Sequence, residues 1–89
     1  MLIVNVTNRF KRDLKLAARR GKDIDNIEAI IELLKARTPL PARNRDHNLS
    51  GEWHSHRECH IEPDWLLIYR GDDEFLHLER TGSHADLFD

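Results

Sequence analysis

The chain has 89 residues, of which 39% are hydrophobic and 34% are charged, and its formal net charge at pH 7 is −2. This length allows one domain with a single core over residues 1–89 and excludes a dinucleotide-binding domain of the Rossmann type. The single cysteine excludes an internal disulfide framework and is typical of a reducing compartment, and no apolar run approaches the ~20 residues of a membrane-spanning helix. We therefore expect a cytoplasmic protein with no membrane partner.

The two halves of the chain differ in charge. Residues 1–45 contain 11 of the 14 Lys and Arg residues, whereas residues 46–89 contain 11 of the 16 Asp and Glu residues and all six histidines. A basic half suits docking on an anionic polymer, and a histidine-rich half suits proton transfer near neutral pH. Charge alone, however, favours the simpler interpretation of a well-solvated surface.

The N-terminal segment predicts a strand and then a helix. Residues 2–6, LIVNV, are short, apolar and largely β-branched, which favours a strand. Thr7 or Asn8 is a suitable N-cap for a helix that runs to about Arg20 and ends at Gly21. One face of this helix is apolar and its other positions are rich in Lys and Arg, so its solvent face is basic.

A second helix and a long loop follow. Residues 23–37 begin with a cap at Asp23 or Asp25 and have large aliphatic side chains at helical spacing, whose expected role is core packing. Residues 38–51, TPLPARNRDHNLSG, contain two prolines, two asparagines and a glycine. They predict a long loop, and such loops in compact domains are often functional.

The remaining residues predict three strands at about 52–61, 65–70 and 75–80, joined by two tight turns. The tail after these strands is expected to form only a turn and a few extended residues. The order strand-helix-helix-strand-strand-strand predicts an α+β domain, in which two helices pack on one face of a mainly antiparallel sheet. The opposite face would be open to a ligand.

Residues 54–65, HSHRECHIEPDW, are rich in histidine and carboxylates. In a strand, His54, His56, Glu58 and His60 would share one side. Two imidazoles at this spacing can bind zinc, but no third ligand stands out in the sequence. We therefore expect no metal ion, and interpret His54 and His56 as surface residues near the start of the strand.

An acid–base site is the alternative interpretation. If the last three strands are adjacent, their ends and flanking segments bring together His47, His60, Asp64, Arg80 and His84. One imidazole can take a proton and another can give one, while the guanidinium holds a phosphate. This set suits RNA cleavage without a metal or other cofactor, in which the ribose 2′-hydroxyl attacks the adjacent phosphate. Each residue also has an ordinary role in a loop, turn or ion pair.

Three segments resemble the YafQ-type toxins of the RelE/ParE superfamily. They are DHNLSGEW, RECHIEPDWLLIY and LERTGSHADLF, which occur in this order between residues 46 and 88, about half of the chain. The N-terminal half is similar in its pattern of one strand and two helices more than in particular residues. The resemblance implies a small RelE/ParE-like toxin domain and agrees with the expected fold.

The resemblance also implies an activity and partners. The protein would be a bacterial type II toxin and an endoribonuclease that cuts translated mRNA on the 70S ribosome, and a cognate antitoxin would neutralise it. By motif position, the functional residues are His47, His60, Asp64, Trp65, Arg80, His84 and Phe88. His60 and His84 would transfer protons with help from His47. Asp64 would orient a histidine, Arg80 would stabilise the phosphate, and Trp65 and Phe88 would position or stack on bases.

The basic first helix is then expected to face ribosomal RNA. Its RNA-binding residues would be Arg9, Lys11, Arg12, Lys15, Arg19, Arg20 and Lys22. Two other functions stay open: a non-enzymatic, ParE-like inhibitor of DNA gyrase, and a small zinc-binding module built on His54 and His56. Several histidines favour the nuclease over the gyrase inhibitor, because a protein that only occludes its partner needs no converging imidazoles.

Overall fold

A five-stranded sheet of order β1-β5-β4-β3-β2 forms the centre of the computed structural model, which describes residues 1–88. The strands are β1 (Ile3–Val6), β2 (His47–Asn48), β3 (Arg57–Glu62), β4 (Trp65–Gly71) and β5 (Phe75–Gly82). β1 is parallel to β5, and the other neighbouring strands are antiparallel. The first strand of the chain therefore lies beside the last one, and the predicted mainly antiparallel sheet is confirmed.

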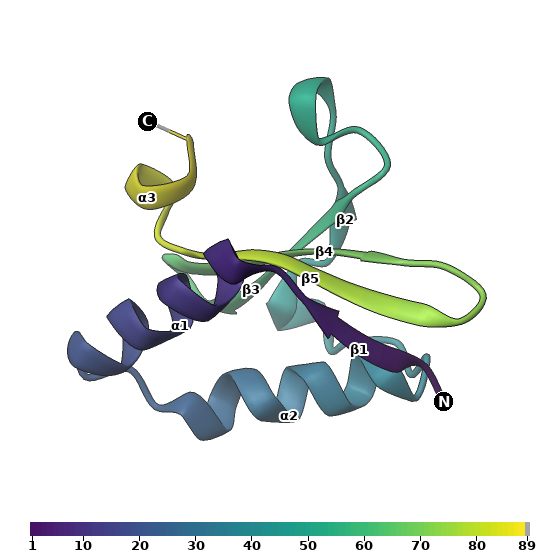
Figure 1. The fold of residues 1–89 in the computed structure, drawn as a ribbon, viewed down its shortest axis with the longest axis horizontal. Coiled ribbons are helices and arrows are strands. Elements are labelled where there is room, and N and C mark those ends of the chain that lie inside the picture. The colour runs from purple at the N-terminus through teal and green to yellow at the C-terminus, as the bar shows by residue number, and fades with distance from the viewer. Residues whose placement is uncertain (89) are drawn as a thin grey trace.

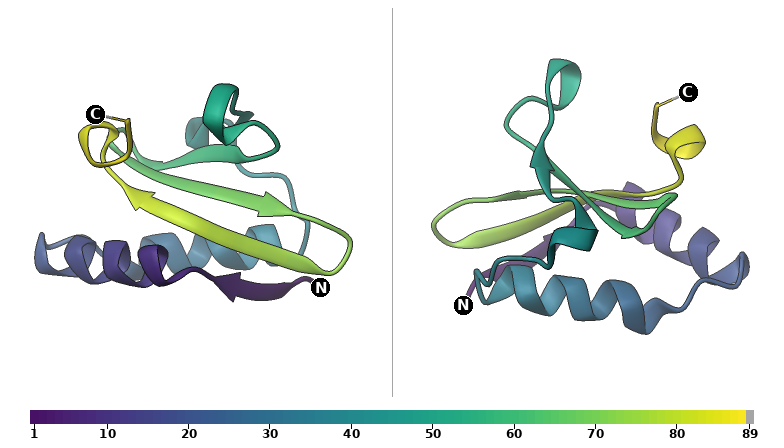
Figure 2. Two further views of the ribbon diagram at one scale, coloured as in Figure 1. Left: turned by 45° about the horizontal axis from the view of Figure 1, so that its top comes forward. Right: turned by 180° about the vertical axis from the view of Figure 1, so that it is seen from behind.

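The helices lie on both sides of this sheet (Figure 1). The longer two, α1 (Asn8–Arg19) and α2 (Ile24–Lys35), cover one face, as predicted. The short α3 (His84–Phe88) stands on the opposite side, as do β2 and the 3₁₀ turn η2 (Gly51–Trp53) (Figure 2). A second 3₁₀ turn, η1 (Ala42–Asn44), precedes β2. No helix among the described residues is both long enough and apolar enough to cross a membrane.

Side-chain caps fix where the two long helices begin. The Thr7 hydroxyl accepts a hydrogen bond from the Phe10 amide at 2.9 Å, and the Asp23 carboxylate accepts one from the Asp25 amide at 3.0 Å. Each cap satisfies an amide that has no partner within its helix. The N-caps are therefore Thr7, not Asn8, and Asp23, not Asp25.

The main core lies between α1, α2 and the sheet. Ile27 of α2 is completely buried, and it packs in one cluster with Cys59 of β3 and Leu67 of β4. β4 is also buried on its other face, where Leu66 and Ile68 have no exposed surface. The central strand is therefore apolar on both faces, which explains its continuous run of hydrophobic residues.

Three predicted segments differ from the structure. The strand expected at 52–61 begins only at Arg57, because residues 51–53 form η2 and Ser55 has a positive φ of 72°, which interrupts extended backbone. The loop expected at 38–51 contains η1 and the two-residue strand β2. The tail forms the helix α3 instead of a simple turn.

Polar contacts hold α3 against α1. The Asp86 carboxylate accepts hydrogen bonds from Arg20 Nη1 at 2.6 Å and from the Ser83 amide at 3.0 Å. A Cβ atom at position 82 would lie 2.9 Å from the Asp86 Cβ, so the close approach of α3 to the end of β5 requires Gly82. The Arg20–Asp86 ion pair therefore anchors the tail at the protein surface, and Gly82 provides the space that α3 needs to approach β5.

Substituting Ile27 tests the core assignment. We expect Ile27→Ala to lower the free energy of unfolding by about 2–5 kcal/mol, because the truncation leaves a cavity at a completely buried position. Ile31→Ala on the same helix should cost less, since Ile31 is only partly buried. Urea unfolding followed by circular dichroism measures both. Equal losses for the two variants would contradict the burial pattern of α2.

A second prediction concerns the pH at which α3 separates from α1. The Arg20 hydrogen bond, helped by the Ser83 amide, lowers the pKa of Asp86 from its ordinary 3.8 to about 2. Because the folded pKa is depressed, the contact is fully stabilising above pH 3.8 and is lost as the pH falls toward 2. The amide chemical shifts of Leu87 should follow this transition. In Asp86→Asn they should show no such transition, and a wild-type midpoint near 3.8 would contradict the anchoring role.

Candidate active site

One row of residues crosses the sheet on the face opposite α1 and α2. His47 of β2 pairs with Glu58 of β3, Glu58 with Ile68 of β4, and Ile68 with Arg80 of β5. His60, two residues after Glu58 on the same strand, lies in the adjacent row. Because directly paired residues and alternate residues share a face, these polar side chains emerge on the same side of the sheet.

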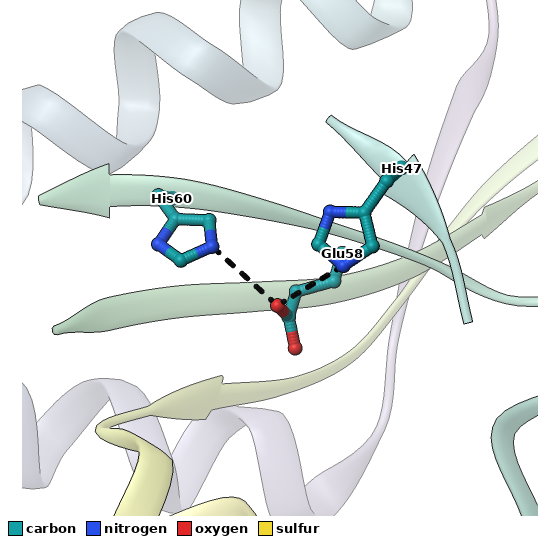
Figure 3. A group of neighbouring side chains, drawn as sticks. All are labelled: His47, Glu58 and His60. Atoms are coloured by element: carbon teal, nitrogen blue, oxygen red, sulfur yellow. Dashed lines mark ion pairs between the residues drawn. The ribbon is translucent and has the colours of Figure 1, made fainter. Parts of the chain in front are cut away.

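The centre of this face is the Glu58 carboxylate between two imidazoles (Figure 3). Its Oε1 atom lies 3.5 Å from His47 Nε2 and 3.6 Å from His60 Nε2. The Glu58 side chain is 6% exposed and that of His60 is 9%, whereas that of His47 is 48% exposed. The carboxylate and His60 are therefore buried together, while His47 can be reached from solvent.

Backbone carbonyls orient both rings. His47 Nδ1 lies 2.7 Å from the Arg45 carbonyl oxygen, and His60 Nδ1 lies 3.2 Å from that of Pro63. Since a carbonyl only accepts, Nδ1 carries the hydrogen in each ring and Nε2 faces Glu58. Position and tautomer of the two imidazoles are thus set by the surrounding main chain.

Asp46 fastens the segment that carries His47. Its carboxylate accepts hydrogen bonds from Arg57 Nε, at 3.2 Å, and from the Tyr69 hydroxyl. Burial, together with this bond to Asp46, raises the pKa of Tyr69, so the hydroxyl remains a donor throughout the physiological range. The short strand β2 is held to the sheet through these contacts as well as through its two pairing positions.

A third imidazole comes from α3. The His84 and His60 ring centroids are 5.8 Å apart, and those of His60 and His47 are 6.3 Å apart. Asp64 Oδ1 accepts from the His84 amide at 2.9 Å and from its Nδ1 at 2.6 Å, and the backbone bond is the main cause of the lowered pKa of Asp64. His84 Nε2 is left for a substrate. The structure therefore brings together three histidines from β2, β3 and α3.

Phe88 borders the third imidazole. Its ring centroid is 6.5 Å from that of His84, and the residue is 46% exposed. An exposed aromatic ring next to a site with polar groups is a suitable surface for a planar base. Its predicted role in positioning a base stays a prediction, and the structure leaves the ring accessible for it.

Arg80 shares this row by its register with Ile68, but its guanidinium is already paired with a residue of α1. Its Nε and Nη2 atoms donate to the two oxygens of Asp13 at 2.7 and 3.1 Å, and its side chain is 14% exposed. Asp13 also accepts from the Thr81 amide at 3.2 Å. The guanidinium is thereby fixed in position, and Nη1 is the edge that has no hydrogen-bond partner among the described residues.

Trp65 does not have the predicted role. The residue is 1% exposed, and its Nε1 donates to Thr81 Oγ1 at 3.0 Å. As the first residue of β4 it faces α1 and α2 and belongs to the main core. The expectation that its ring stacks on a base is therefore wrong, because no base can reach it.

The predicted basic surface is present on α1, although two of its members are paired. Arg20 contacts Asp86 at 2.6 Å and Lys22 contacts Glu62 at 2.8 Å. The other five are exposed and form no ion pair with a described residue; they are Arg9, Lys11, Arg12, Lys15 and Arg19. These five, defined here as the basic face of α1, are available to an anionic partner.

The residues that the structure places best for binding a metal ion differ from those considered in the sequence. His54 lies in the turn before β3, with Nδ1 3.2 Å from the Gly51 carbonyl oxygen, and His56 Nε2 lies 3.8 Å from Glu79. The described residues that offer converging ligand atoms are instead His47, Glu58 and His60, within 4.8 Å of one another. Sequence reasoning placed Glu58 and His60 on one face but gave Glu58 no role.

The lone cysteine takes no part in this site. Cys59 lies between Glu58 and His60 in the sequence, but its side chain faces the helices and has no exposed surface. Burial raises the pKa of its thiol to about 12, so it is neither a nucleophile nor a metal ligand at neutral pH.

Known proteins share both the sequence and this architecture. The family described as "Bacterial toxin of type II toxin-antitoxin system, YafQ" matches residues 2–89. The mRNA interferase toxin YafQ of Escherichia coli K12 is 44% identical over 86 residues, which cover 96% of this chain and 94% of that protein.

Two solved structures are similar over almost the whole chain. The DinJ-YafQ toxin-antitoxin complex of Escherichia coli contains a chain with a TM-score of 0.92 and 42% identity, covering 99% of this chain and 98% of that one. A copper-bound mutant toxin from Helicobacter pylori has a TM-score of 0.95 and 39% identity, with 99% and 100% covered. Sequence and fold thus agree, and the chain belongs to the YafQ family of bacterial toxins from type II toxin-antitoxin systems.

Proposed function

We propose that the protein is an endoribonuclease that cleaves translated mRNA on the ribosome and is neutralised by a cognate antitoxin. The convergence of three imidazoles carries this proposal: His60 lies between His47 and His84, and the buried Glu58 carboxylate lies beside His47 and His60. Family membership supports it, since the Escherichia coli relative is an mRNA interferase and a related toxin has been crystallised with the antitoxin DinJ. Such a substrate places the protein in the bacterial cytoplasm.

The reaction needs a base and an acid on opposite sides of one phosphate. The ribose 2′-oxygen attacks phosphorus as its proton passes to the base, and the P–O5′ bond breaks as the acid protonates the leaving oxygen. The products are a 2′,3′-cyclic phosphate and a 5′-hydroxyl. The bonds and protons of this reaction balance without a metal or other cofactor. DNA lacks the attacking hydroxyl and is not a substrate.

The geometry suggests how the proton-transfer groups divide into two units. His84 is exposed, and Asp64 holds its Nδ1, so Nε2 can exchange a proton with one of the two reacting oxygens. On the other side, His60 is coupled to the buried Glu58, which stabilises a positive charge on the ring after proton uptake. The more exposed His47 contacts the same carboxylate and would assist His60 in proton transfer.

Arg80 and Phe88 would hold the substrate between these units. Arg80 Nη1 is the free edge of a guanidinium that Asp13 keeps in place, and it would stabilise the charge that develops on the phosphate. Phe88 would position a base beside His84. Asp13 is thus a positioning residue that sequence reasoning did not find.

Histidine variants provide the most direct test. Wild type, His84→Ala and His54→Ala are each induced in bacteria, and the 5′ ends of cellular mRNA are mapped. We expect cuts at codon-linked positions with wild type and with His54→Ala, whose ring lies in a turn outside the site. Loss of a proton-transfer group should reduce cleavage about 100-fold or more in His84→Ala.

The same experiment distinguishes the nuclease from the alternative function, the inhibition of DNA gyrase. Growth arrest without mapped cuts would reject the nuclease and favour inhibition of DNA gyrase. Equal cleavage by wild type and His84→Ala would reject the proposed site. Circular dichroism of the purified variants controls for loss of fold, which we do not expect because the side chain of His84 is 56% exposed.

The basic face of α1 gives a prediction about ribosome binding. In an inactive His84→Ala background, replacing Lys11, Arg12 and Lys15 with Gln should weaken binding and make it less sensitive to KCl. Each lost phosphate contact should lower the slope of log affinity against log salt by roughly 0.7–0.9. The matched control is Lys35→Gln on α2, whose Nζ already pairs with Glu32 at 3.3 Å. An unchanged slope would show that α1 does not contact ribosomal RNA.

A further inference from the structure

We propose that a pocket beside His60 is a second substrate subsite, which binds the nucleotide that carries the attacking 2′-hydroxyl. Arg43 and Arg45 line this pocket and would hold the 5′-phosphate of the nucleotide, while its base enters the pocket. The inference rests on the proposed function, because it concerns the strand that the nuclease cuts. Neither arginine belongs to the residues that the sequence predicted for RNA binding.

The pocket lies at the outer edge of β3. β2 pairs with Arg57 and Glu58 at the start of that strand, and η1 packs beside the residues that follow. Between η1 and the turn after β3 is a pocket of about 300 Å³, with His60 and Pro63 among its lining residues. This volume is within the range of small-molecule sites and accommodates one nucleobase.

The pocket has an excess of positive charge. Arg43 and Arg45 are both exposed, and neither forms an ion pair with a described residue. The Glu62 carboxylate also lines the pocket, but it pairs with Lys22 Nζ at 2.8 Å, which balances its charge. Guanidinium groups bind phosphate oxygens through strong, charge-assisted hydrogen bonds. Two guanidinium groups without a carboxylate partner therefore favour an anionic ligand such as a phosphodiester.

The wall of the pocket contains a polar atom without a partner. Asn44 lines the pocket and is 4% exposed, and its Nδ2 atom donates to the His60 carbonyl oxygen at 2.8 Å. Its Oδ1 atom is buried and has no hydrogen-bond partner among the described residues. A buried acceptor without a donor costs free energy, which an N–H group bound in the pocket would offset. Because nucleobases carry such N–H groups, Asn44 favours a base as the occupant.

The pocket adjoins the groups that the proposed reaction uses as its base. Two of its lining residues hold the imidazoles: the Arg45 carbonyl oxygen lies 2.7 Å from His47 Nδ1, and that of Pro63 lies 3.2 Å from His60 Nδ1. Since His60 would take its proton from the 2′-oxygen, the nucleotide that supplies this oxygen must lie next to it. The leaving nucleotide would lie at the other end of the site, beside Phe88.

Combined changes in the protein and the mRNA test the phosphate contact. Cleavage on programmed ribosomes is measured as kcat/KM, with an unmodified mRNA and with one whose linkage immediately 5′ of the scissile phosphate is an uncharged methylphosphonate. Arg43→Gln and Arg45→Gln should each lower kcat/KM about 10-fold or more on the unmodified mRNA, but have little further effect on the modified one. Both variants keep the main-chain carbonyl that holds His47. The matched control, Lys35→Gln, should cleave both mRNAs as wild type does.

The outcomes separate this inference from the proposed function. If the arginine variants lose the same factor on both mRNAs, they contact ribosomal RNA instead of the substrate, and the inference is overturned while the nuclease stands. Replacing the base of the same nucleotide by an abasic residue should lower cleavage by wild type at least about 5-fold. Unchanged cleavage of that mRNA would also overturn the subsite. If wild type does not cut the unmodified mRNA, the proposed function fails and the subsite fails with it.

Discussion

The register of β3 on β4 is the constraint on which the candidate site depends. Glu58 pairs with Ile68, and His60 pairs with Leu66, so both polar side chains emerge on the face away from α1 and α2. A slip of one residue would bring Cys59 to that face and bury Glu58 in the main core. β4 is apolar on both faces, so its sequence would tolerate either register. The polar and apolar alternation of β3 does exclude the slip, because a carboxylate moved into the main core would lie among apolar side chains instead of beside the two imidazoles.

A second feature of the sheet sets the position of Arg80. The register between β4 and β5 shifts between Ile68 and Tyr69, so that Leu78 pairs with Tyr69 while Arg80 pairs with Ile68. Glu79 is the extra residue of this bulge, and it changes which alternate residues face the helices. Leu78 and Thr81 both belong to the helix side, whereas Arg80 emerges with Glu58. Without the bulge, strict alternation from Leu78 would direct the guanidinium into the core.

This dependence on register explains what the sequence predicted and what it did not. The long helices and the strands from Trp65 and Phe75 have clear hydrophobic periods and caps, so their existence followed from local pattern. A two-residue strand such as β2 has no period, and the five-residue α3 depends on Asp86 contacts that join distant segments. The burial of Trp65 was missed for a similar reason, since a motif fixes the position of an aromatic residue in the chain but not the face on which it lies. Glu58 had one usable signal, its alternation with His60, which became meaningful only when β2 placed His47 opposite it.

The Glu58 carboxylate is the electrostatic centre of the proposed reaction. Its Oε1 atom lies 3.5 Å from His47 Nε2 and 3.6 Å from His60 Nε2, and its side chain is 6% exposed. In the proposed cleavage, a proton taken up by His60 leaves a positive charge directly beside this carboxylate, and the poor access of water strengthens the attraction between the two charges. The carbonyl oxygens of Arg45 and Pro63 hold both rings in the orientation that this step requires. The register that brings Glu58 to the open face of the sheet therefore also supplies the negative charge that the proposed base needs.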